Sequence, residues 1–234
     1  MGLLVDRVIA SYFATNCWII APNAGEQCLV VDPGIELPSM VASLRKKLAE
    51  HRLSIGAILI THGHLDHTFS LFPVASDFGC RQSLIHELDR DLLTFPERAL
   101  SAQSMQLFND LREKFPETRI EEPEGTFSVG DGELLHLGGM SVRITHTPGH
   151  TPGSIVATVD DDVLVSGDTL FAGSIGRTDL PRGSISDMEG SLREKIATLP
   201  GHLRVLPGHG DETRIERELK ENPYVLQALA GRLA

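Results

Sequence analysis

The chain has 234 residues, a hydrophobic fraction of 41% and a formal net charge of -11. This length suits one large domain or two small ones, and the apolar content is ample for a sizeable buried core. The acidic charge argues against nucleic acid or an anionic membrane as the main partner, because both require basic surface, but it does not exclude a small anionic substrate.

No apolar run reaches the roughly 18 residues that a transmembrane helix requires. The N-terminal stretch MGLLVDRVIASYF is a poor signal peptide, because Asp6 and Arg7 interrupt its apolar residues. The three cysteines, Cys17, Cys28 and Cys80, are an odd and sparse set that does not indicate a disulfide framework. We therefore expect buried, reduced cysteines and a cytoplasmic protein.

The first half of the chain predicts strands followed by helices. Short apolar runs rich in Val, Ile and Trp indicate strands over 5–11, 16–22 and 27–34. A helix is expected over about 38–51, where Val41, Leu44 and Leu48 share one face. The continuous apolar run 55–61 is typical of a strand buried on both faces, and a second helix is expected over 70–79.

The second half repeats this order. Leucine spacing predicts a helix over about 97–114, and Gly-rich turns then separate strands over 126–130, 133–139, 141–150, 154–160 and 162–168. A helix is expected over 187–199, a last strand and loop over 203–210, and a C-terminal helix over about 213–220. This order predicts an α/β fold of four layers, with two stacked sheets and helices outside them, in a single domain over 1–234.

The run THGHLDHT at 61–68 places three histidines and one aspartate within six positions. Neutral imidazole and carboxylate are common protein ligands for Zn, Mn and Fe. In an extended segment the rings of His62 and His64 fall on one side, whereas Asp66 and His67 follow a turn and face a second point. The stretch can therefore serve two neighbouring metal ions.

Three further ligand-type residues lie in Gly- or Pro-rich loops after apolar strands: His150, Asp168 and His209. Each alone is an ordinary loop residue, but together they favour a shared site at strand ends. The other histidines lack this setting beside a neighbouring ligand. His146 is the nearest rival, and we expect it to have a supporting structural role.

The segments THGHLDH, TPGHTPGS, SGDTLF and LPGHG, in this order, resemble the metallo-β-lactamase superfamily over nearly the whole chain. The resemblance implies a four-layer αββα sandwich. It also implies a first divalent metal at His62, His64 and His150, a second at Asp66, His67 and His209, and Asp168 between the two. The ions are expected to be Zn, with Fe or Mn also suited to these ligands.

The stretch GDTLFAGSIGRTDLPRGS resembles the glyoxalase II group, the hydroxyacylglutathione hydrolases, and in particular its short bacterial members. This resemblance implies hydrolysis of a small-molecule thioester such as S-D-lactoylglutathione. It makes Arg177 the candidate that binds a carboxylate of the thiol, although a loop salt bridge is nearly as good an explanation. Longer members carry an extra C-terminal helical region with tyrosines, so the thiol carrier is left open.

In the expected mechanism, a water that bridges the metals becomes hydroxide and attacks the thioester, with Asp66 as its proton acceptor. A thiolate leaving group needs no general acid. Alternatives are an iron-dependent persulfide dioxygenase of the same superfamily, a lactonase or β-lactamase, and a metal-binding protein without turnover. The oligomeric state is not determined by the sequence.

Overall fold

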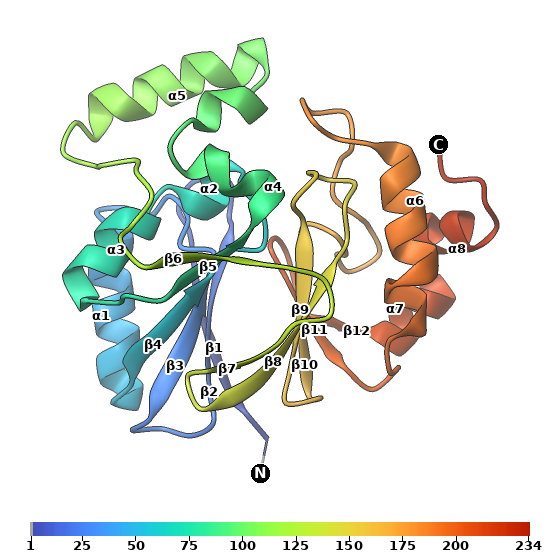
Figure 1. Ribbon diagram of the computed structural model, residues 1–234, viewed down its shortest axis with the longest axis horizontal. Helices are drawn as coiled ribbons and strands as arrows, with labels where there is room; N and C mark the ends of the chain where they lie inside the picture. The colour runs from blue at the N-terminus through green and yellow to red at the C-terminus, as the bar shows by residue number, and fades with distance from the viewer. Residues whose placement is uncertain (1) are drawn as a thin grey trace.

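The computed structural model describes residues 2–234 and arranges them around two six-stranded sheets packed face to face (Figure 1). In spatial order, the first sheet contains β1 (Leu4–Ile9), β2 (Asn16–Ala21), β3 (Gln27–Val31), β4 (Ser54–Leu59), β5 (Ser83–His86) and β6 (Thr126–Val129). The second contains β12 (Thr213–Arg214), β11 (Arg204–Pro207), β10 (Val163–Gly167), β9 (Ile155–Val159), β8 (Met140–His146) and β7 (Leu134–Leu137). Both sheets mix parallel and antiparallel pairs.

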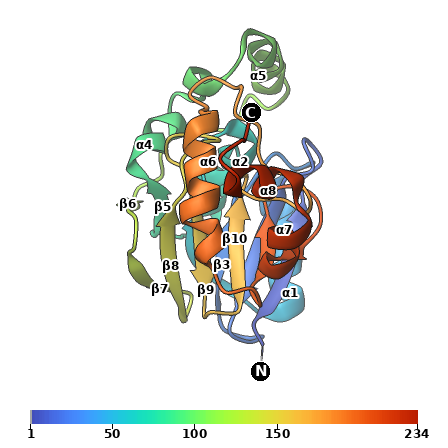
Figure 2. The same cartoon turned by 90° about the vertical axis from the view of Figure 1, so that its right-hand side faces the viewer.

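Helices cover the outer face of each sheet (Figures 1 and 2). On the first sheet lie α1 (Met40–His51) and α3 (Leu71–Phe78), and on the second lie α6 (Ile185–Glu194), α7 (Ile215–Glu221) and α8 (Pro223–Leu229). The remaining helical segments are α2 (Leu65–Thr68), α4 (Glu87–Arg90), α5 (Ala102–Lys114) and the short turns η1 (Asp91–Leu93), η2 (Pro96–Ala99) and η3 (Ile196–Thr198). The expected αββα sandwich is confirmed.

The strands β2 and β3 of the first sheet are largely apolar on both sides because both sides are covered. In β2 every residue is buried. Trp18 and Ile20 face the second sheet, whereas Cys17 and Ile19 face α1 and α3, as the alternation of a strand requires. All three cysteines are free and buried, as expected.

Some elements differ from the sequence-based prediction. The short strand β5 was not predicted, yet it lies between β4 and β6. The C-terminal helical region is divided, because Pro223 begins a new helix and the Asn222 side chain accepts hydrogen bonds from the first amides of α8. Residues 213–214 form the edge strand β12 rather than a helix.

Helix α5 stands apart from the two outer layers, above the end of the sandwich (Figure 1). Its residues Phe108 and Leu111 are buried in a cluster with Ile35, Leu65 and Phe69. This cluster joins α5 to α2, the short helix that contains Asp66 and His67. The helix is therefore fixed beside the loop that carries most of the candidate ligands.

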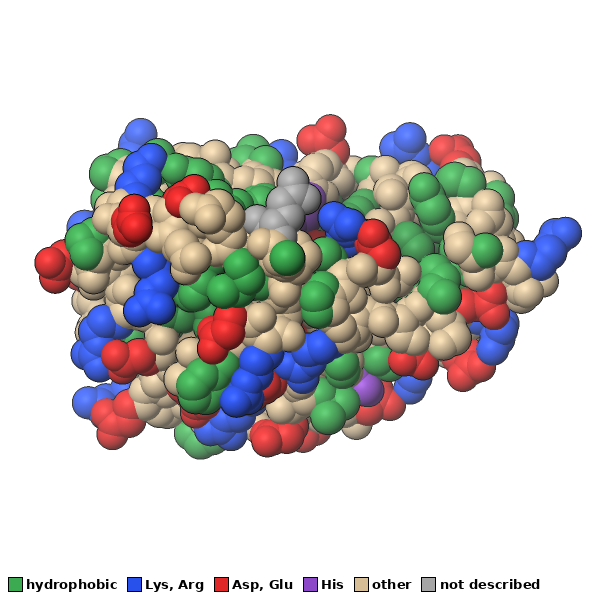
Figure 3. Space-filling model, turned by 90° about the horizontal axis from the view of Figure 1, so that it is seen from above, with side chains coloured by type: hydrophobic (Ala, Val, Ile, Leu, Met, Phe, Trp, Pro, Cys, Tyr) green, Lys and Arg blue, Asp and Glu red, His purple; other side chains and the backbone are tan. Residues whose placement is uncertain are grey.

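On the face drawn in Figure 3, Lys and Arg side chains lie among Asp and Glu side chains rather than in one basic field. Within residues 2–234, no helix has both the length and the apolar character needed to cross a lipid bilayer.

Candidate metal centre

The seven candidate ligands follow strands of both sheets and meet at one end of the sandwich. His62, His64, Asp66 and His67 follow β4, in the middle of the first sheet. His150 lies in the loop between β8 and β9, Asp168 directly follows β10, and His209 follows β11. The strand ends are rigid, so the loops that leave them can hold side chains in fixed positions.

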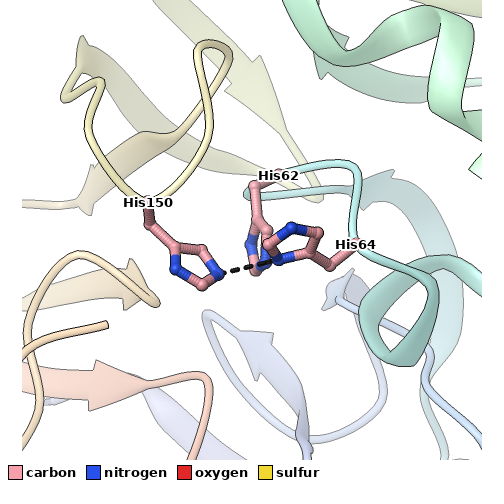
Figure 4. Close-up of side chains that lie close together, drawn as sticks. All are labelled: His62, His64 and His150. Carbon is pink, nitrogen blue, oxygen red and sulfur yellow. Dashed lines mark hydrogen bonds between the residues drawn. The ribbon is translucent and has the colours of Figure 1, made fainter. Parts of the chain in front are cut away.

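The first cluster consists of His62, His64 and His150. Nδ1 of His64 lies 3.1 Å from Nε2 of His62 and 2.8 Å from Nε2 of His150. Figure 4 shows the three rings converging from the loop after β4 and from the β8–β9 loop. All three side chains are buried. Three ring nitrogens therefore point at one small volume.

The second cluster consists of Asp66, His67 and His209. Nε2 of His209 lies 3.3 Å from Oδ2 of Asp66 and 3.2 Å from Nε2 of His67. Oδ2 of Asp66 also lies 3.5 Å from Nε2 of His67. One ligand atom from each residue is thus within reach of a common point.

Asp168 lies between the two clusters. Its Oδ2 is 3.5 Å from Nε2 of His150 and 3.5 Å from Nε2 of His209, and its Oδ1 is 3.4 Å from Nε2 of His67. One carboxylate therefore faces ligand atoms of both clusters.

Hydrogen bonds on the far side of the rings determine which nitrogen faces inward. Three rings have their outer nitrogen against an acceptor: His150 Nδ1 against Arg177 O (2.7 Å), His67 Nδ1 against Asp32 Oδ2 (2.9 Å) and His209 Nδ1 against Phe13 O (3.0 Å). An N–H that donates outward leaves the lone pair of the neutral ring on the inner nitrogen. This orientation is typical of histidines that bind metal.

Asp32 was not predicted as a site residue. It is buried, and it accepts hydrogen bonds from the backbone N–H of Thr61 (2.8 Å), from Oγ1 of Thr61 (2.6 Å) and from Nδ1 of His67. Because Oγ1 of Thr61 donates to Asp32, it accepts from Nδ1 of His62 at 3.1 Å. The carboxylate of Asp32 therefore orients one histidine of each cluster: His67 directly, and His62 through the hydroxyl of Thr61.

Asp89 is a second buried carboxylate that was not predicted. It accepts hydrogen bonds from the backbone N–H of Gly63 (2.8 Å), the backbone N–H of Gly153 (2.9 Å) and the hydroxyl of Thr151 (2.6 Å). Gly63 lies between His62 and His64, and the other two follow His150. Asp89 therefore ties together the two loops that form the first cluster.

The two clusters differ in their electrostatics. Burial, together with the neighbouring imidazoles, lowers the pKa of His64 to about 3 and that of His62 well below its usual value. Burial also disfavours the charged form of His67, but the carboxylates of Asp66 and Asp168 outweigh it and raise the pKa of His67 to about 9. His62 and His64 of the first cluster are thus neutral at pH 7, whereas the carboxylates beside His67 in the second cluster stabilise positive charge.

These features fit a pair of metal ions. Oδ1 of Asp168 is buried and lacks a hydrogen-bond partner within residues 2–234. A buried polar atom without a partner is costly, and a ligand bond removes that cost for Asp168. Imidazole and carboxylate donors suit Zn, Fe and Mn alike.

A glycine is required beside the site at position 208. A methyl group there would collide with Oδ1 of Asp168 and would lie 2.7 Å from Cε1 of His67. The backbone of the last loop can therefore approach the clusters only without a side chain.

A cavity of about 500 Å³ opens beside the two clusters. Arg177 lines it, but its guanidinium forms two 2.7 Å hydrogen bonds with the carboxylate of Asp179. Its backbone carbonyl, rather than its charge, contacts the first cluster through His150. His146 lies outside both clusters, as expected, with its Nε2 2.7 Å from the carbonyl of Pro152.

Comparisons with known proteins agree with this geometry. A family model described as the metallo-beta-lactamase superfamily matches residues 11–209. The chain belongs to this superfamily, whose members are typically hydrolytic metalloenzymes with a divalent metal pair.

Three similar proteins cover almost all of the chain. An uncharacterized protein of Mycobacterium tuberculosis is 38% identical over 229 residues, which are 95% of this chain and 98% of that protein. Hydroxyacylglutathione hydrolase GloC of Haemophilus influenzae is 32% identical over 223 residues, with coverages of 94% and 97%. The crystal structure of the BLEG-1 B3 metallo-β-lactamase superposes with a TM-score of 0.80 at 29% identity, with coverages of 95% and 99%.

Proposed function

We propose that this protein is a metal-dependent thioester hydrolase of the glyoxalase II type, with S-D-lactoylglutathione as a representative substrate. The first cluster would hold one divalent cation, the second cluster another, and Asp168 would contact both. The observation that carries the proposal is the convergence of seven ligand-type side chains from both sheets on one end of the sandwich, beside a cavity. The similarity to GloC supports the thioester.

When bound, such a metal pair polarises the substrate carbonyl and makes a nearby water more acidic. In hydrolysis the oxygen of water joins the acyl carbon, the carbon–sulfur bond breaks, and a proton ends on the thiol sulfur. Oδ2 of Asp66 would accept the proton that the attacking water loses. It is half-buried, faces the cavity, and receives a 3.2 Å hydrogen bond from Oγ1 of Thr15.

No Ser or Cys nucleophile is needed for this reaction. The three cysteines are buried, and burial raises the pKa of Cys28 to about 12, so that thiol is not ionised at neutral pH. Arg177 would bind a carboxylate of the thiol carrier. For this its guanidinium would exchange the exposed carboxylate of Asp179 for that of the substrate.

The test is metal analysis of the purified protein followed by thioester hydrolysis with several thiol carriers, glutathione among them. We expect two bound ions and turnover that Asp66→Ala abolishes. A fully loaded protein that cleaves no thioester would refute the proposal. Oxygen uptake with glutathione persulfide would favour the dioxygenase alternative instead.

A second candidate function, hydrolysis of a β-lactam, is favoured by the similarity to BLEG-1. Both reactions use the same metal ligands, so the candidate metal centre does not indicate which of the two reactions the protein catalyses. Parallel assays of one metal-loaded preparation on a β-lactam and on a thioester would decide between the two.

A further inference from the structure

The cavity beside the metal centre has apolar walls on two sides. Helix α5 and the turn before it form one wall, and the loop after Asp168 forms the other. The side chains that define these walls are Leu100, Leu107 and Leu111 on one side and Phe171, Ile175 and Leu180 on the other. A pocket of about 500 Å³ with such walls is typical of one that binds a partly apolar small molecule.

The α5 wall is anchored to the metal centre. Phe108 and Leu111 are buried against Leu65 and Phe69, and Leu65 directly follows His64. Leu107 is only half-buried and lines the cavity. The apolar wall is therefore held at a fixed place relative to the candidate ligands.

Outside the candidate metal centre, the cavity has a charged side chain only on the wall formed by the loop after Asp168, among the residues that the structure describes. Apart from the two clusters and Asp168, Arg177 is the only charged residue among the described residues that line the cavity. Among the described side chains of α5 that line the cavity, only that of Ser104 is polar. A charged or hydroxylated group against α5 would lose its hydration without gaining enough partners, and this is unfavourable.

We infer that, among the thioesters that the proposed activity would cleave, those with an apolar acyl chain of medium length, such as hexanoyl, are hydrolysed faster than lactoyl thioesters. This inference rests on the proposed thioester hydrolysis and names the acyl side of that substrate. The thiol carrier, with any carboxylate, extends toward Arg177, so the acyl chain lies against Leu100, Leu107 and Leu111. Water adds its oxygen to the acyl carbon, and the products are the fatty acid and the free thiol.

The experiment compares acyl groups on a single carrier. S-lactoyl-, S-propionyl-, S-butyryl- and S-hexanoylglutathione are assayed with the metal-loaded protein. Each buried methylene contributes a factor of roughly three to four, and hexanoyl has three more carbons than propionyl or lactoyl, so we expect its kcat/KM to be higher by roughly 30- to 60-fold. A flat series, or one in which lactoyl is best, would overturn the inference.

A pair of variants on α5 tests the wall itself. Leu107→Asn places an amide in the cavity, whereas Glu113→Asn introduces the same residue at an exposed position of the same helix. We expect Leu107→Asn to lower the hexanoyl-to-lactoyl ratio of kcat/KM at least fivefold and Glu113→Asn to leave it unchanged. An unchanged ratio in Leu107→Asn contradicts the inference.

Product binding gives a readout that does not depend on turnover. Calorimetry on the metal-loaded protein should show hexanoate binding at least tenfold more tightly than lactate, and equal affinities would count against the apolar wall. Failure of the proposed function can be distinguished from failure of the chain preference, because a protein that cleaves no thioester of the series refutes thioester hydrolysis itself. A protein that cleaves lactoyl and hexanoyl thioesters equally well retains the function and refutes only the chain preference.

Discussion

Replacing Asp89 by Asn is the sharpest test of how the first cluster is held. Each carboxylate oxygen of Asp89 accepts at least one hydrogen bond: Oδ1 from Gly153 N–H, and Oδ2 from Gly63 N–H and the Thr151 hydroxyl. The substitution keeps the shape but converts one oxygen to NH₂, which then faces a backbone N–H. With the NH₂ toward Gly153, one buried donor loses its acceptor, at a cost of about 1–3 kcal/mol.

The expected result is a loss of about 2 kcal/mol in the free energy of unfolding, measured by urea denaturation of the metal-free protein. Because the donors flank His62, His64 and His150, we also expect metal affinity to fall roughly 10- to 100-fold in a competition titration with a chelating dye. Asp211→Asn is the matched control, because the Asp211 side chain is 93% exposed and its 3.8 Å ion pair with Arg7 is screened by solvent, so the substitution should affect neither quantity. If Asp89→Asn unfolds and binds metal like the unmodified protein, Asp89 does not position the ligand loops.

Three further predictions concern pH, close packing and metal. Burial alone would raise the pKa of Asp6, but hydrogen bonds from His51 and Lys47 lower it below its value in the unfolded chain, which is about 3.9. Ionised Asp6 therefore stabilises the fold above that pH, and this stabilisation is lost as the pH falls through the lower pKa of the folded state. Asp6→Asn should therefore cost about 1 kcal/mol at pH 7 and nothing at low pH, as followed by urea denaturation at each pH. Gly208→Ala should displace Asp168 and reduce the bound metal measured by elemental analysis, whereas Gly190→Ala, which has open space around it, should retain the metal and gain about 0.5–1 kcal/mol of stability. Removing the metal with a chelator should abolish thioester hydrolysis and lower the thermal midpoint, and adding Zn should restore both; hydrolysis that persists without metal would contradict the proposed chemistry.

The sequence predicted the layers because their patterns are local. The strands β2, β4 and β10 are largely apolar runs, and the Gly-containing loops after β4 and β10 carry five of the candidate ligands. The seven candidate ligands were recognised for the same reason, since each stands in a short loop after an apolar run. The short strand β5 was not predicted, because four residues are too few to show the alternation of a strand.

The supporting carboxylates required the tertiary structure. Asp32 follows a strand in the segment VVDPG and resembles an aspartate of an ordinary turn. Asp89 lies within the short helix α4, where its charge suggests a solvated surface. Only the packing of distant loops shows that both side chains are buried. Similarly, the leucine spacing of α5 predicted an apolar face, but not that Leu107 would line the cavity.

The candidate centre draws its side chains from both halves of the sandwich: four follow a strand of the first sheet and three come from loops of the second. An ion held there would link the two sheets, because each cluster takes its ligands from both of them. Any fluctuation that separates the sheets would also break the contacts to the ion, so bound metal should slow the exchange of backbone amides at the interface between the sheets.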